Sequence, residues 1–178
     1  MPARLDVHTA HRGRLLALQV LTWTDAQGRT VQREVVRHPG AVLVVPELPG
    51  DRIVMLLNRR VAVDGTLWEL PAGTLEPPET PRQAAGRELE EETGWRAGWI
   101  EPMGEFYTSP GFCDELMRVF VARDLHWVGP RPEPHEEIEV RIVPLEEALA
   151  MVDDGRIRDG KTIAALLMRV RRGAGRAE

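Results

Sequence analysis

The sequence predicts an α/β sandwich with a mixed sheet, preceded by an N-terminal β-hairpin. Three observations lead to this prediction. Short apolar segments of strand-like composition fill much of the chain, a well-capped helix interrupts them near the middle, and a helical apolar stripe follows near the C-terminus. Hydrophobic residues make up 43% of the 178 residues, which is enough for one core without disulfide or metal staples.

The first third of the chain reads as strands. An apolar segment over residues 14–23, a turn at 25–28 and a return strand over 29–36 predict the hairpin. Two further short strands are predicted at 41–45 and 52–57, on either side of the turn residues 49–51.

The central helix is predicted to run from Pro81 to Thr93. Thr80 is a suitable N-cap, Pro81 suits the first helical position, and Gln83 completes a capping box. Gly94 supplies the C-terminal stop.

The rest of the chain predicts three strands and two helices. The strands are expected at 99–107, 116–122 and 138–143, and a short helix at 145–152. The last helix carries an apolar stripe with the spacing i, i+3, i+4, i+7, which predicts a core-facing side made of Ile163, Leu166, Leu167 and Val170.

Composition excludes several classes of protein. No apolar run approaches the ~20 residues of a membrane helix, and the N-terminal segment lacks the apolar stretch of a secretory signal. Cys113 is the only cysteine, so no intrachain disulfide can form and a reducing cytoplasm is expected. The net charge of −5 disfavours a nucleic-acid binder that works by bulk electrostatics.

Three glutamates of the central helix point to a metal ion. Glu88, Glu91 and Glu92 follow the spacing i, i+3, i+4 and therefore share one helix face. Like charges at this spacing cost roughly 0.2–0.5 kcal/mol per pair, and anions in the last turn oppose the helix dipole. A hard cation, Mg²⁺ or Mn²⁺, explains this face better than the alternative of a solvated charged surface.

The surrounding residues resemble the signature of the Nudix hydrolases. Gly73, five residues, Glu79, seven residues and the run Arg87-Glu88-Leu89-Glu90-Glu91-Glu92-Thr93-Gly94-Trp95 match the Nudix box. This resemblance implies the Nudix α/β/α sandwich and the hydrolysis of a nucleoside diphosphate linked to another moiety. It also implies divalent metal ions that offset the charge of the pyrophosphate and activate the attacking water.

The resemblance assigns roles within the box. Glu88, Glu91, Glu92 and the backbone carbonyl of Ala72 are implied metal ligands, with Glu91 and Glu92 taking part in catalysis. The remaining box residues are expected to be structural: Gly73, Glu79, Arg87 and Gly94. Among them, Arg87 and Glu79 are expected to form an ion pair.

Features outside the box resemble the ADP-ribose pyrophosphatase subfamily. Pro110 follows Gly94 by sixteen residues, at the position of the subfamily's marker proline, and with Ser109 it is expected to contact substrate. Segments 36–42 and 67–73 resemble the subfamily's entry to the core and its strand before the box. The resemblance divides the chain into a hairpin region (1–38) that crosses onto the partner of a homodimer, a hydrolase domain (39–172) and a frayed tail (173–178).

Substrate contacts are implied for three more residues. Arg59 is expected on the substrate phosphates, with Arg60 as an adjacent competitor. Glu69 precedes the metal loop and is expected to touch metal or substrate. Trp23 is expected to stack on adenine from the partner subunit, against the alternative that it is a core or interface residue.

A second acidic cluster supplies a candidate general base. In related enzymes a glutamate on a loop before a late strand positions or deprotonates the water. Glu136, two residues before the strand predicted at 138, takes this role here, with Glu133 and Glu137 as alternatives. A solvated acidic loop is the competing interpretation.

The predicted function is Mg²⁺-dependent hydrolysis of ADP-ribose to AMP and ribose 5-phosphate. The alternative is another nucleoside diphosphate sugar or a dinucleotide, such as GDP-mannose, NADH or FAD. An oxidised-nucleotide triphosphatase is disfavoured because those enzymes usually lack the N-terminal hairpin. A ligand-binding module without catalysis is disfavoured because all box glutamates are present.

Overall fold

The computed structural model describes residues 5–131 and 137–174. The chain divides into two compact units, one made of residues 1–40 and 106–117 and the other of residues 41–105 and 118–178. Within the described residues, no helix has both the length and the apolar character needed to span a membrane.

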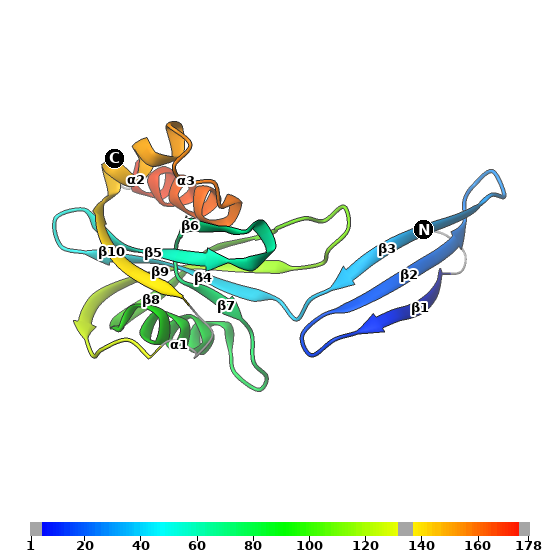
Figure 1. The fold of residues 1–178 in the computed structure, drawn as a ribbon, viewed down its shortest axis with the longest axis horizontal. Helices are drawn as coiled ribbons and strands as arrows, with labels where there is room; N and C mark the ends of the chain where they lie inside the picture. Colours follow the sequence, from blue (N-terminus) through cyan, green and yellow to red (C-terminus); the bar gives the residue numbers. More distant parts are fainter. Residues whose placement is uncertain (1–4, 132–136, 175–178) are drawn as a thin grey trace. The chain divides into compact units, whose positions relative to one another are not determined.

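The first unit contains a three-stranded antiparallel sheet with the strand order β1-β2-β3 (Figure 1). The predicted hairpin corresponds to β2 and β3, and Asp25 closes its turn by accepting hydrogen bonds of 2.9 Å from the N–H groups of Gln27 and Arg29. β1 was not predicted, because only Leu5 and Val7 show the alternation of apolar and polar residues that is typical of a strand. The strand bounds are β1 Leu5–Arg12, β2 Ala17–Thr24 and β3 Thr30–Arg37.

A seven-stranded sheet forms the middle of the second unit. Its strand order is β10-β5-β4-β9-β8, with β6 paired to β5 and β7 paired to β4. The strand expected before the box at 67–73 is divided into two short strands, β6 and β7, and η1 was not predicted, since segments of three to five residues carry little periodicity. The bounds are β4 Ala41–Leu48, β5 Arg52–Arg60, η1 Val61–Val63, β6 Gly65–Glu69, β7 Ala72–Thr74, β8 Trp95–Tyr107, β9 Leu116–Trp127 and β10 Ile138–Pro144.

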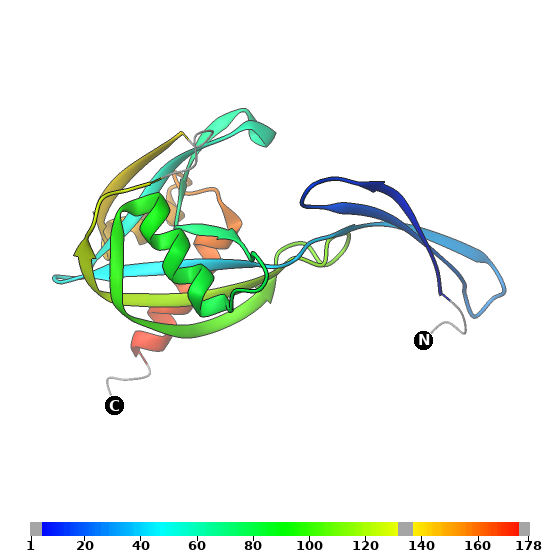
Figure 2. The same ribbon diagram turned by 90° about the horizontal axis from the view of Figure 1, so that it is seen from below.

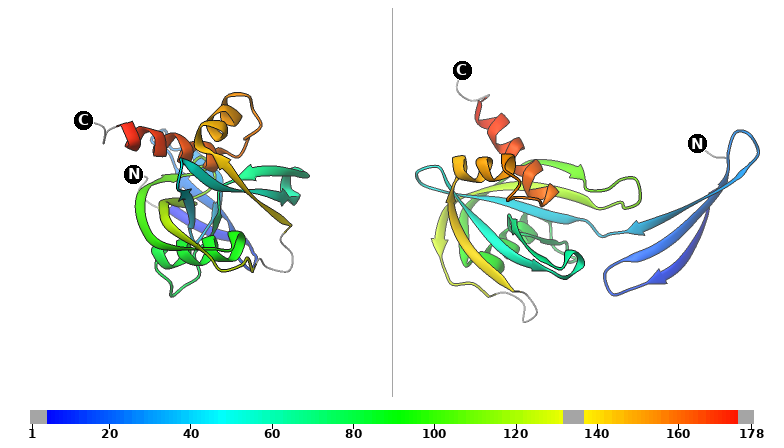
Figure 3. Two further views of the ribbon diagram at one scale, coloured as in Figure 1. Left: turned by 90° about the vertical axis from the view of Figure 1, so that its left-hand side faces the viewer. Right: turned by 45° about the horizontal axis from the view of Figure 1, so that its top comes forward.

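Helices cover both faces of this sheet. α1 (Pro81–Thr93) lies on one face, and α2 (Leu145–Asp153) and α3 (Gly160–Ala174) lie on the other (Figures 1 and 3). The first six residues of β4 are all buried, as expected of a strand covered on both sides. The predicted α/β sandwich is therefore confirmed.

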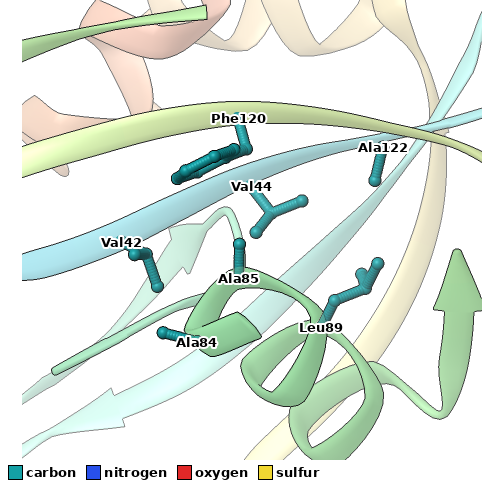
Figure 4. Close-up of a cluster of buried hydrophobic side chains, with 7 residues drawn as sticks. All are labelled: Val42, Val44, Ala84, Ala85, Leu89, Phe120 and Ala122. Carbon is teal, nitrogen blue, oxygen red and sulfur yellow. The ribbon is translucent and has the colours of Figure 1, made fainter. Parts of the chain in front are cut away.

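α1 packs against the sheet through small and aliphatic side chains. Ala84, Ala85 and Leu89 are fully buried and meet Val42 and Phe120 of the sheet (Figure 4). The two alanines have no bulk to keep the helix backbone away from β4. Figure 2 shows α1 lying across the strands of the sheet, and the packing of its buried side fixes the position of the helix whose last turns carry the glutamates.

The ends of α1 are as predicted. The side chain of Thr80 accepts a hydrogen bond from the N–H of Gln83, and the Gln83 side chain accepts one of 2.8 Å from the N–H of Thr80. Gly94 has a φ of 75° in the left-handed region. A Cβ at Gly94 would lie 2.5 Å from the backbone nitrogen of Pro130, so this position needs glycine for space as well as for conformation.

The predicted core face of the last helix is wrong by about one residue, or roughly 100° of rotation. Leu167 and Val170 are 49% and 37% exposed, whereas Thr162, Ala165 and Leu166 are buried. The Thr162 hydroxyl accepts a hydrogen bond of 2.9 Å from the backbone N–H of Leu70. This polar contact turns Thr162 inward, which a stripe of apolar residues alone cannot predict.

Candidate metal and active site

Arg87 is the centre of the ion pairs on the glutamate face of α1. Its Nε and Nη2 donate to the two carboxylate oxygens of Glu79 at 3.1 and 2.7 Å, so the ion pair expected between them is present. Its Nη1 donates to Glu88 at 2.8 Å and to Glu91 at 3.1 Å. Hydrogen bonds from Arg87 hold the pKa of Glu79 below its ordinary value. Arg87 thus ties the loop before α1 to two of the three clustered glutamates.

Glu92 is held from the other side by the loop that precedes the box. Its side chain is 4% exposed, and its Oε2 accepts a hydrogen bond of 3.0 Å from the backbone N–H of Ala72. The loop is itself attached to the sheet, because the N–H of Val44 donates to the carbonyl of Pro71 at 2.9 Å. The sheet therefore fixes Ala72 beside Glu92.

Gly73 brings the same loop against Glu88. A Cβ built on Gly73 would lie 1.9 Å from Oε1 of Glu88 and 2.0 Å from its Cδ. Any side chain at this position would displace the carboxylate or the loop backbone. The requirement for glycine here is therefore steric, since the carboxylate occupies the space beside its Cα.

The donors gathered at this point are all oxygen atoms. Three carboxylates and the nearby Ala72–Thr74 strand offer the ligand chemistry that Mg²⁺ and Mn²⁺ prefer. Within residues 5–131 and 137–174, no three acidic, histidine or cysteine side chains already converge as a metal cluster. Arg87 instead contacts Glu88 and Glu91, as expected for a cation among carboxylates that repel one another.

A second ion-pair network surrounds Glu69, which is 1% exposed at the end of β6. Arg60 donates to both of its oxygens, from Nε at 2.8 Å and from Nη2 at 2.6 Å. Nζ of Lys161 donates to Oε2 of Glu69 at 2.8 Å and lies 2.9 Å from Asp159. Burial raises the pKa of Glu69, but the bonds and charges of Arg60 and Lys161 together lower it below its ordinary value.

Comparison with known proteins identifies the family. A model of the NUDIX domain matches residues 37–166 of this chain. The chain belongs to the Nudix family.

Three similar proteins illustrate the likeness. A protein of Bacillus subtilis (strain 168) named ADP-ribose pyrophosphatase is 40% identical over 156 residues, covering 86% of this chain and 84% of its own. A protein of Bacillus methanolicus named methanol dehydrogenase activator has the same identity and coverage. A solved structure described as an ADP compounds hydrolase has a TM-score of 0.84 at 23% identity, covering 99% of this chain and 96% of its own, which supports the Nudix fold.

The two candidate phosphate-binding arginines of this Nudix chain occupy different surroundings. Consecutive strand residues point to opposite faces of the sheet, so Arg59 and Arg60 cannot both face the carboxylates. Arg59 pairs with the exposed Asp64 at 2.5 Å. Arg60 pairs with Glu69, and the negative charge of Glu92 also acts on it and helps to raise its pKa.

Other predicted site residues lie elsewhere in the chain. Trp23 is on β2, and Ser109 and Pro110 precede β9; all three belong to the first unit. Glu133 and Glu136 lie outside the described residues, so their role stays a prediction. Glu137 is exposed, and its carbonyl accepts a hydrogen bond of 3.1 Å from the N–H of Arg59.

Some residues near the Nudix site were not predicted. Lys161 and Thr162 join the network from the N-terminus of α3, 92 positions after their partners Glu69 and Leu70, and Asp159 contacts both of them. The cap pattern at Asp159 is a local signal, since its carboxylate accepts hydrogen bonds from the Thr162 N–H and hydroxyl at 3.1 and 2.6 Å. The contacts of Lys161 with Glu69 and of Thr162 with Leu70 join distant parts of the chain, and no local sequence pattern indicates them.

The contact between Gly73 and Glu88 yields a testable prediction. We expect Gly73→Ala to push the Glu88 carboxylate away and to weaken Mn²⁺ binding by about 10-fold or more, as measured by calorimetry. Gly65→Ala is the matched control, because its nearest atom, the Val63 carbonyl oxygen, is an ordinary 3.6 Å from the added Cβ. Equal Mn²⁺ affinity in both variants would show that Glu88 does not bind the metal.

Proposed function

We propose that this protein is a Mg²⁺-dependent hydrolase that cleaves the pyrophosphate of ADP-ribose into AMP and ribose 5-phosphate. The observation that carries the proposal is the position of Glu88 and Glu92 against the loop at Gly73 and Ala72, with Glu91 on the same helix face and bonded to Arg87. The B. subtilis relative named ADP-ribose pyrophosphatase, at 40% identity over most of both chains, supports the choice of substrate.

The three glutamates and the carbonyl of Ala72 would hold the metal, with Mn²⁺ as the alternative ion. When bound, the ion offsets the charge of the pyrophosphate and makes a coordinated water more acidic. Arg87 restrains Glu88 and Glu91, while the Ala72 N–H restrains Glu92. The protein's own contribution is thus to hold the carboxylates in place before substrate arrives.

Substrate contacts are proposed for one arginine of β5 and, from the resemblance to ADP-ribose pyrophosphatases, for three further residues. Arg60 is a better candidate than Arg59 for the phosphates, because its charge lies beside Glu69 and Glu92 rather than in an exposed pair with Asp64. A guanidinium offers the paired donors that phosphate oxygens accept. The residues proposed to contact the rest of the substrate are Trp23, Ser109 and Pro110.

Glu136 is our proposed general base, with Glu133 and Glu137 as alternatives. The described residues on either side of this segment are attached near the site. The N–H of Arg131 donates to the carbonyl of Glu91 at 2.9 Å, and the carbonyl of Glu137 accepts from Arg59 on β5. These attachments to α1 and β5 support a glutamate of this segment as the group that accepts the proton from water.

We propose that residues 1–38 form a hairpin region and residues 39–172 the hydrolase domain. An apolar face of the first sheet supports a homodimer that forms through the hairpin region. Opposite residues of antiparallel strands point the same way, so the register places Leu5, Trp23 and Val31 in one row and Val7 and Leu21, with Arg33 at the end, in the next. Leu5 and Val7 are 48% and 47% exposed. An apolar face on a three-stranded sheet gains stability from a partner, and a second copy supplies one.

Product analysis with Mg²⁺ tests the function. The panel is ADP-ribose, GDP-mannose, NADH, FAD, diadenosine polyphosphates and 8-oxo-dGTP. We expect preferred conversion of ADP-ribose to AMP, and its loss in Glu92→Gln, whose amide oxygen can still accept the Ala72 hydrogen bond. If another compound is preferred, the protein is still a Nudix hydrolase but its substrate is not ADP-ribose. If no compound is hydrolysed, a binding module without catalysis is favoured.

The general base has its own test. We expect Glu136→Gln to lower kcat by about 100-fold while Mn²⁺ affinity stays near normal, because proton acceptance is lost and the metal ligands remain. Glu133→Gln and Glu137→Gln serve as matched controls. A loss below about threefold in Glu136→Gln, with a large loss in either control, would reassign the base.

The dimer is tested by size-exclusion chromatography with light scattering. We expect the native protein at twice the 20.0 kDa chain mass and Leu21→Lys at one chain mass, because a buried ammonium opposes apolar contact. Thr22→Lys is the control, since Thr22 lies in the row of Asp6 and Gln32 on the other face. A native monomer would refute the proposal.

A further inference from the structure

The charges around Glu69 balance only when Lys161 is included. Glu69 and Asp159 are two carboxylates, and Arg60 and Lys161 are two cations in direct contact with them. Glu69 is 1% exposed, so little water reaches its carboxylate to stabilise the charge. Without Lys161, Arg60 alone would neutralise Glu69, and Asp159 would add an unbalanced negative charge close by.

Lys161 is held in place by the start of α3. Asp159 caps this helix through the N–H and hydroxyl of Thr162, and Thr162 in turn accepts the hydrogen bond of Leu70. Lys161 is 17% exposed and donates to Glu69 at 2.8 Å. The ammonium therefore sits at a fixed point between two carboxylates rather than on a free side chain.

The choice of lysine is itself informative, because Lys161 is the only lysine in a chain rich in arginine. A guanidinium presents a planar fork that fits both oxygens of a carboxylate, whereas an ammonium is a compact donor that needs only one. Lys161 bonds to Oε2 of Glu69 and leaves both oxygens accessible to Arg60. A second arginine at this place would compete with Arg60 for the same carboxylate.

We propose that Lys161 is a positioning residue, which shares the charge of Glu69 so that Arg60 remains available to the substrate pyrophosphate. This inference rests on the proposed function, because it assumes a pyrophosphate bound beside Arg60. Its consequence is a defect in binding rather than in chemistry. An unbalanced carboxylate both retains Arg60 and repels the anionic substrate, while the glutamates of α1 keep their positions.

Steady-state kinetics on ADP-ribose with saturating Mg²⁺ test this role. We expect Lys161→Met to raise KM about 10-fold and to change kcat less than about threefold. The double variant Asp159→Asn/Lys161→Met should return KM to within about threefold of the native value, because it removes one charge of each sign and leaves the Arg60–Glu69 pair balanced. Arg171→Met, which removes an exposed cation from the same helix, is the control and should leave KM unchanged.

A second variant keeps the test valid if Lys161→Met fails to fold. Lys161→Gln removes the charge but keeps N–H groups that can donate to Glu69, and we expect it to fold and still raise KM, because the carboxylates are again unbalanced. An unchanged KM in either variant overturns the proposal. So does a folded double variant whose KM stays as high as that of Lys161→Met.

Calorimetry with inorganic pyrophosphate and Mg²⁺ separates this inference from the proposed function. If the native protein hydrolyses no compound of the panel but pyrophosphate affinity falls about 10-fold in Lys161→Met and recovers in the double variant, the function fails and the inference holds. If ADP-ribose is hydrolysed and neither KM nor pyrophosphate affinity responds to Lys161→Met, the inference fails and the function holds. Native protein that does not bind pyrophosphate also overturns the inference.

Discussion

The repulsion among three glutamates on one helix face is the constraint on which the site depends. Arg87 offsets it by donating to Glu88 and Glu91 while holding Glu79 in the preceding loop. The core side of α1, with its two alanines, keeps the helix close to the sheet, so this face cannot relax by moving away. The fold thus supplies the free energy that keeps like charges together.

The loop between β6 and β7 joins the two ion-pair networks. Leu70 donates its N–H to α3, and two positions later Ala72 donates to Glu92 of α1. The carboxylate of Glu88 occupies the space beside Gly73, so a Cβ at this position would clash with it. Four consecutive residues, 70–73, are therefore restrained by α3, the sheet and α1.

Local signals account for what the sequence could predict. The ends of α1 depend on Thr80, Gln83 and Gly94, which act on backbone groups within four residues, and they were located correctly. The face of α3 was wrong because Thr162 is turned inward by Leu70, 92 positions earlier. The network at Glu69 has the same origin, since ion pairs between distant segments leave no periodicity. The metal site was indicated by the spacing of the three glutamates and by the Nudix box, and the substrate contacts by resemblance outside the box; both stay predictions.

The direction of the pKa shifts limits what can titrate at this site near neutral pH. Glu69 and Glu79 have pKa values below their ordinary ones, so each contributes stability above its unfolded pKa and loses it only as the pH falls through the lowered value. Glu69 and Glu79 are therefore ionised at neutral pH. Titration of these two glutamates therefore does not contribute to a change of rate near neutral pH, and the loss of their ion pairs belongs to acid unfolding.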